Sequence, residues 1–146
     1  MIQAGEPFVL EYNCRFGDPE TQVTLPRLYS DIMDIFQAVD QENLGKINLK
    51  WRYQATTCVV LASKGYPGTY QKGKIIKGLE QIVKEKNIFA FCAGVKRENN
   101  QLITNGGRVI GITGMGKNLK ESAKITYRGV RKISFDGMHY RKDIGI

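Results

Sequence analysis

The sequence predicts an α+β fold, and three observations support that class. Runs rich in β-branched and aromatic residues, such as 51–63, indicate strands. Two other stretches, at 30–40 and 118–133, carry apolar residues at spacings of three and four, which indicates amphipathic helices. These strands and helices follow one another without the regular strand–helix–strand alternation of parallel α/β proteins.

The first predicted element is a strand over residues 8–16, preceded by a turn and by only enough chain for a short first arm of a hairpin. With a period of two, one face of this strand is entirely apolar or aromatic: Phe8, Leu10, Tyr12, Cys14 and Phe16. The opposite face carries Glu11, Asn13 and Arg15 in a row. The strand is therefore expected to be buried on one side and polar on the other.

An amphipathic helix is predicted over residues 30–40, after shorter helical turns. The apolar positions of this region recur at spacings of three and four: Leu25, Leu28, Ile32, Ile35 and Val39. A turn at 43–46, which contains Gly45, follows the helix and marks the predicted domain boundary.

The remaining chain is predicted to hold four strands. Strands over 51–63 and 87–98 flank a basic glycine loop at 64–74. Residues 101–116 are predicted to form a hairpin of two more strands, because the Asn-Gly pair at 105–106 is a strong turn signal.

The last predicted element is a helix that begins at Asn118. Asn118 suits the N-cap position, and Glu121 three residues later completes the pattern of a capping box. Its inner face is predicted to consist of Leu119, Ala123, Thr126, Val130 and Ile133.

The composition of the 146 residues, 42% hydrophobic and 25% charged, is that of an ordinary globular protein. No stretch approaches the length of an apolar membrane span, and residues 1–20 lack the basic start and apolar run of a signal peptide. The predicted location is therefore cytoplasmic, with no membrane partner.

Three cysteines, Cys14, Cys58 and Cys92, lie far apart in apolar runs and in no CxxC spacing. They are predicted to be buried thiols and not disulfides or zinc ligands. The single histidine, His139, excludes histidine-rich metal sites and is expected to be a packed residue of the tail.

The net charge of +8 favours anionic ligands, which include nucleotides, sugar phosphates and nucleic acids. Basic residues are scattered over loops and helices, without an arginine-rich tail, an RNA-binding signature or zinc-finger spacing. Most of them are expected to form a solvated surface, and nucleic acid is the less favoured partner.

The polar face of the first strand suggests a metal site. Glu11 and Asn13 lie two residues apart on this face, so their oxygens suit shared coordination of Mg²⁺ between the protein and phosphate groups. Arg15, next on the same face, could hold a phosphate through two N–H groups. The alternative is a strand with one solvated polar face and no ligand.

The run LEYNCRFGDPETQVTLPRL, which begins at Leu10, resembles the glycinamide ribonucleotide synthetases (phosphoribosylamine-glycine ligases). Their signature strand has the form E-[FY]-N-x-R-F-G-D-P-E-[TA]-Q. Three later runs, VVLASKGYPGTYQKGK, TNGGRVIGITGMG and FDGMHYRKDIG, resemble the C-terminal domain of that family and occur in the family's order. Met115, near the end of the run TNGGRVIGITGMG, and Lys117, just after it, depart from the leucine and the acidic residue that the family usually shows there.

The resemblance implies a division of the chain. Residues 1–42 would form the C-terminal end of an ATP-grasp domain, and residues 43–146 the family's small C-terminal domain. The family joins glycine to 5-phosphoribosylamine in purine biosynthesis, with ATP as a substrate and Mg²⁺ or Mn²⁺ as the metal. By this resemblance Glu11 and Asn13 are the metal ligands.

Further site residues follow from the position of the signature. Arg15 and Asp18 are predicted catalytic residues: Arg15 to contact a phosphate, and Asp18 to position the substrate amine or to brace the loop. Outside the signature, Arg108 lies just beyond the turn of the NGGR run and is the predicted cofactor-binding residue, through a contact with a sugar phosphate. The alternative is an ordinary surface arginine. The loop 64–74 could cover a phosphate with Lys64, Lys72 and Lys74, although a purely structural loop is the favoured interpretation.

The resemblance also implies that most of the ATP-grasp lobes are absent from these residues. The chain alone is therefore expected to fold but to be inactive, or to assemble with a separate N-terminal portion. The alternative function is a stand-alone basic module that binds nucleic acid or nucleotides without catalysis.

Overall fold

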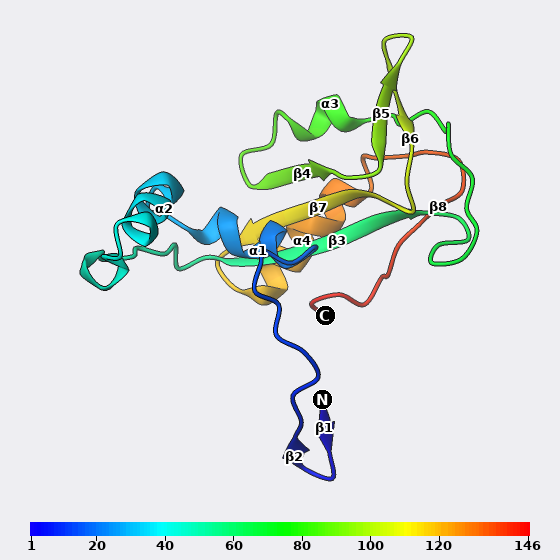
Figure 1. Ribbon diagram of the computed structural model, residues 1–146. Coiled ribbons are helices and arrows are strands. Elements are labelled where there is room, and N and C mark those ends of the chain that lie inside the picture. The colour runs from blue at the N-terminus through cyan, green and yellow to red at the C-terminus, as the bar shows by residue number, and fades with distance from the viewer.

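The computed structural model describes residues 1–146, and its centre is a four-stranded antiparallel sheet (Figure 1). The order of strands in the sheet is β4–β7–β3–β8. The bounds of these strands are Ala55–Ser63 for β3, Ile88–Cys92 for β4, Arg108–Gly116 for β7 and Met138–His139 for β8. The helix α4 (Leu119–Val130) packs across one face of the sheet. The predicted mixture of helices and strands is confirmed.

The two central strands, β3 and β7, pair along almost their whole length. Their register runs from Ala55 opposite Gly116 to Leu61 opposite Ile110, and it shifts after Leu61. The predicted strand over 51–63 begins later than expected, at Ala55. Trp51 makes only an isolated bridge with Leu28.

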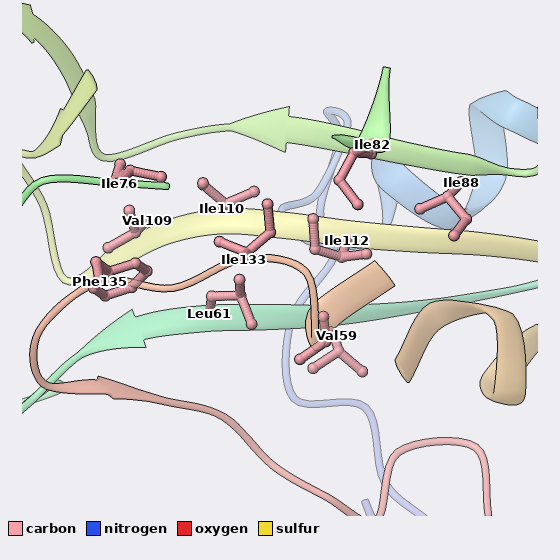
Figure 2. Close-up of a cluster of buried hydrophobic side chains, with 11 residues drawn as sticks. Val59, Leu61, Ile76, Ile82, Ile88, Val109, Ile110, Ile112, Ile133 and Phe135 are labelled. Carbon is pink, nitrogen blue, oxygen red and sulfur yellow. The ribbon is translucent and has the colours of Figure 1, made fainter. Parts of the chain in front are cut away.

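The hydrophobic core lies between the sheet and α4. Eleven buried side chains form it, ten of which are labelled in Figure 2: Val59, Leu61, Ile76, Ile82, Ile88, Val109, Ile110, Ile112, Val130, Ile133 and Phe135. The α4 helix was correctly predicted, and its inner face is buried at Ala123, Thr126 and Val130. Leu119 was wrongly placed on that face, because it lies in the first turn and is 56% exposed.

The structure corrects the prediction for residues 87–116. The single strand expected at 87–98 is interrupted at residues 93–94, so β4 is followed by a separate strand β5 (Val95–Glu98). The strand β6 (Gln101–Thr104) pairs with β5 and not with β7, through a turn at Asn99 and Asn100 with φ of 45° and 61°. The predicted hairpin with its turn at 105–106 is therefore wrong. The β5–β6 ribbon projects from the sheet (Figure 1).

The N-terminal third consists of short elements. A small hairpin of β1 (Ile2–Gln3) and β2 (Glu6–Pro7) comes first. It is followed by α1 (Thr21–Thr24), the 3₁₀ turn η1 (Leu25–Arg27), the predicted helix α2 (Ile32–Asp40) and a second 3₁₀ turn, η2 (Leu44–Lys46). The short helix α3 (Leu79–Ile82), which precedes β4, was not expected from the sequence.

The strand predicted over residues 8–16 is wrong for this chain. Only Phe8 pairs, through two backbone hydrogen bonds of 2.7 Å with Met1 at the end of the small hairpin. The side chains expected to be buried are exposed: 51% for Phe8, 73% for Leu10 and 83% for Tyr12. The alternation of apolar and polar residues is present, but no neighbouring strand lies beside it to form a sheet.

The buried-thiol prediction holds only in part. Cys14 and Cys92 are exposed and Cys58 is partly buried, and all three are free thiols. Burial raises the pKa of the Cys58 thiol above its ordinary value. His139 lies on the short edge strand β8 and is exposed, so the expectation that it is packed is also wrong. No helix has both the length and the apolar character that crossing a membrane requires.

Candidate functional site

Two threonines of the central strands hold α1 against the sheet. Thr56 Oγ1 on β3 donates a hydrogen bond of 2.6 Å to the carbonyl oxygen of Val23. Thr113 Oγ1 on β7 donates one of 3.0 Å to the carbonyl oxygen of Gln22. Because side chains alternate along a strand, Thr56 points away from the face on which its neighbour Thr57 contacts α4 through Ser122. The second face of the sheet therefore fixes the polar turn that precedes α1.

Asp18, in this turn, is held at both of its carboxylate oxygens. Gln22 Nε2 donates to Asp18 Oδ1 at 2.8 Å, and Arg108 Nη2 lies 3.1 Å from Asp18 Oδ2. Arg108 Nη1 also donates to the backbone carbonyl of Asp18 at 3.1 Å. Arg108 begins β7, so this fork of hydrogen bonds joins residues 90 positions apart in the chain. Two predicted site residues are thus brought together, in a contact that the sequence did not predict.

The predicted metal ligands also lie side by side. Asn13 Nδ2 donates a hydrogen bond of 3.0 Å to Glu11 Oε1. Glu11, Asn13, Arg15 and Asp18 line one open recess of about 410 Å³, together with Gly17 and Glu20. Four of the five predicted site residues therefore share one recess. The fifth, Arg108, contacts this group through its ion pair with Asp18.

The donor atoms in this recess fit Mg²⁺ in the manner usual for phosphate-transferring proteins. Nowhere in the chain do three or more His, Cys, Asp or Glu side chains gather closely enough to hold a metal ion by themselves. Glu11 and Asn13 offer a carboxylate and an amide, which are hard oxygen donors. Mg²⁺ commonly takes only one or two carboxylates from a protein and completes its shell with water and substrate phosphates. A carboxylate and an amide are the ligand types that a shared site of this kind takes from the protein.

Sequence reasoning missed Gln22. Besides its bond to Asp18, its Oε1 atom is buried without a hydrogen-bond partner. The spacing of four residues between Asp18 and Gln22, on a helical turn, was a signal that could have identified the pair. Thr56 and Thr113 gave no such local signal, because each contacts a residue distant in sequence.

We expect Arg108→Gln to loosen the turn at 17–24. The loss of the ion pair and of the second hydrogen bond should accelerate amide hydrogen exchange at Thr21 and Thr24 about threefold, since a partly exposed pair contributes under about 1 kcal/mol. Exchange measured by NMR checks this. Arg97→Gln, on the exposed β5–β6 ribbon, is the matched control and should leave both amides unchanged. Equal exchange in both variants would contradict the bracing role.

Comparison with known proteins identifies the family. The family model described as phosphoribosylglycinamide synthetase, C domain, matches residues 56–146. The chain is 46% identical over 144 residues to a phosphoribosylamine–glycine ligase of Caldanaerobacter subterraneus subsp. tengcongensis, covering 99% of this chain and 34% of the relative. It is 48% identical over 147 residues to the ligase of Halalkalibacterium halodurans, covering 99% of this chain and 33% of the relative.

A solved structure agrees with these matches. The crystal structure of phosphoribosylamine–glycine ligase from Thermotoga maritima superposes with a TM-score of 0.77 at 35% identity, over 98% of this chain and 34% of that one. The chain thus spans about a third of the length of the relatives that it matches. It belongs to the phosphoribosylamine–glycine ligase family and corresponds to the C-terminal portion of these enzymes.

Proposed function

We propose that the chain is the C-terminal portion of an ATP- and Mg²⁺-dependent ligase that joins glycine to 5-phosphoribosylamine in purine biosynthesis. The observation that carries this proposal is the single recess lined by Glu11, Asn13, Arg15 and Asp18. Such a recess gathers metal ligands, a phosphate-binding guanidinium and a fixed carboxylate. The alternative of a stand-alone nucleic-acid module gains no support from the family matches.

Each residue of the recess has a proposed role. Glu11 and Asn13 hold the metal, which when bound offsets the charge of phosphate oxygens during phosphoryl transfer. Arg15, which lines the same recess, donates N–H groups to a phosphate. Asp18 is restrained at both oxygens by Gln22 and Arg108, so it presents the substrate with a carboxylate of fixed position and orientation. Mn²⁺, which accepts the same oxygen ligands, is a substitute metal.

The division of the chain is part of the proposal. Residues 1–42 are assigned to the end of an ATP-grasp domain and residues 43–146 to the C-terminal domain. The family model for the C domain supports this division, because its match begins at residue 56. The first part exposes large apolar side chains, among them Leu10, Met33 and Phe36. A segment that exposes this many large apolar side chains presents a contact surface. We assign this surface to the remaining two thirds of the ligase, whether joined to the chain or made separately.

The test is a chimeric ligase. Residues 1–146 replace the aligned third of the Caldanaerobacter enzyme, and ADP formation is measured with ATP, Mg²⁺, glycine and phosphoribosylamine. We expect substrate-dependent turnover from the chimera and none from residues 1–146 alone, because the latter offer one metal edge without a second lobe to enclose the nucleotide. A folded chimera that binds ATP but forms no ADP in the presence of both substrates would contradict the proposal. Turnover by residues 1–146 alone would contradict the assigned dependence on the remainder.

A further inference from the structure

Two open recesses adjoin one another around the loop that follows β3. One, of about 510 Å³, is lined by residues that include Lys74, Lys77 and Asp136. The other, of about 530 Å³, is lined by residues that include Lys64, Lys74 and Asp136. The loop and the segment before β8 that form these recesses lie at the end of the sheet where β3 ends (Figure 1). These two recesses share no lining residue with the recess of Glu11 and Asp18.

The backbone that carries the lysines is fixed. Lys74 N donates to the hydroxyl oxygen of Thr104 at 3.1 Å, and Thr104 N donates to the carbonyl oxygen of Lys74 at 2.8 Å. Lys77 and Ser134 exchange two backbone hydrogen bonds of 2.9 and 3.2 Å. Thr104 is itself buried. The two lysines therefore project from a bridged backbone, although the sequence gives the segment the appearance of a flexible glycine loop.

The tail is brought against the loop by a glycine. Gly137 has φ of +71°, and a Cβ atom at this position would lie 3.0 Å from the Cβ of Lys64. A larger residue would be strained in this backbone conformation and would crowd the lysine. This close approach places the neighbouring Asp136 within reach of lysines from the loop.

Asp136 is the only carboxylate among the residues that line the two recesses, against three lysines. Its Oδ2 atom lies 2.9 Å from Lys74 Nζ. The hydrogen bond and charge of Lys74 hold the pKa of Asp136 below its ordinary value, with a smaller contribution from the charge of Lys64. The carboxylate of Asp136 therefore already pairs with Lys74, and the three lysines that line the recesses exceed it in charge.

We propose that these two recesses form an anion site for a phosphate group, in which the carboxylate of Asp136 competes with the ligand for Lys74. Lys64 and Lys77 supply the further positive charge, and Thr69, Gln71 and Ser134, which also line the recesses, supply hydrogen-bond donors. Lys72, which the sequence grouped with Lys64 and Lys74, does not line either recess, and Lys77 takes its place.

Inorganic phosphate titrated into residues 1–146, with binding followed by amide shifts in NMR spectra, tests the proposal. Lys74→Gln should weaken binding about fivefold, since one charge-assisted hydrogen bond at a partly exposed position is lost. Asp136→Asn should instead tighten binding about threefold, because it removes the competing anion while leaving all three lysines. Opposite effects of these two variants are the signature of competition. Their amide spectra also report whether each variant is folded.

Matched controls separate a site from general charge. Lys120→Gln, on the exposed side of α4, and Asp143→Asn, which breaks another exposed ion pair, make the same charge changes elsewhere. Both controls should leave the phosphate affinity within about a factor of 1.5 of the unaltered chain. The proposal would be overturned if phosphate showed no saturable binding, or if Asp136→Asn bound phosphate more weakly than the unaltered chain. It would also be overturned if either control changed the phosphate affinity as much as the variant that it controls for.

A second arm distinguishes the source of the phosphate group. Ribose 5-phosphate that binds at least about tenfold more tightly than inorganic phosphate would assign the site to a phosphorylated sugar. Equal affinities would assign it to the free anion, and both outcomes support a phosphate site. The measurement uses binding alone, so it stands or falls separately from the proposed ligase activity.

Discussion

Glu11→Gln in the active chimeric ligase is expected to lower turnover by about a hundredfold, with partial recovery at raised Mg²⁺. The substitution keeps the size of the side chain and its hydrogen-bonding oxygen but removes the negative charge. With Asn13 as the other protein donor, Glu11 supplies the only charge of the proposed pair. A weakened metal site can be filled by mass action, which is why added Mg²⁺ should restore part of the rate. The assay is the initial rate of ADP formation over a range of Mg²⁺ concentrations.

Glu20→Gln is the matched control for this prediction. Glu20 lines the same recess, so its substitution makes the same change in charge a short distance from the proposed ligands. It should alter the rate only modestly and should leave the Mg²⁺ dependence unchanged. Wild-type activity of Glu11→Gln at low Mg²⁺ would contradict the assignment. Equal losses in the two variants would show that the recess needs negative charge in general and not a ligand at position 11.

The errors in the predicted fold have a common physical cause. A period of two predicts which face of a strand would be buried, but a strand forms only beside another strand, and residues 9–16 have none. Near residues 99–106, two local turn signals compete, and Asn99 and Asn100 form the hairpin turn while Asn105 and Gly106 do not. Strand β7 is instead committed to β3, whose residues lie more than 40 positions earlier. Local sequence patterns do not report such long-range pairing.

The candidate site was predictable to the extent that it is local. Glu11, Asn13, Arg15 and Asp18 lie within eight residues of one another, and the structure brings all four to one recess. The contact between Asp18 and Arg108 depends on how α1 lies on the sheet, which the hydroxyl groups of two central strands determine. Asp18 and Arg108 could each be singled out from the sequence, but their contact with one another could not.

Gly114→Ala is expected to destabilise the fold by about 3 kcal/mol, because β7 and α4 touch backbone to backbone at this glycine. An added Cβ atom would lie 2.5 Å from Thr126 N and 2.7 Å from the carbonyl oxygen of Ser122. Neither is the end of a flexible side chain, so the helix itself would have to move. Such a movement would also strain the 2.9 Å hydrogen bond from Gly114 N to the buried Thr126 hydroxyl. Urea unfolding followed by circular dichroism measures the loss.

Gly45→Ala is the control that isolates packing from the general effect of replacing glycine. A Cβ atom at Gly45 would meet nothing within 4 Å, and neither glycine has a positive φ, so backbone strain enters in neither case. The alanine at position 45 should change the free energy of unfolding by less than about 1 kcal/mol. The expected change is stabilising, because alanine reduces the conformational entropy of the unfolded chain. If both variants unfold at the same urea concentration, α4 does not pack against β7 as closely as the structure places it. A large loss at position 114 alone identifies the close backbone contact at Gly114 as one that holds α4 on the sheet.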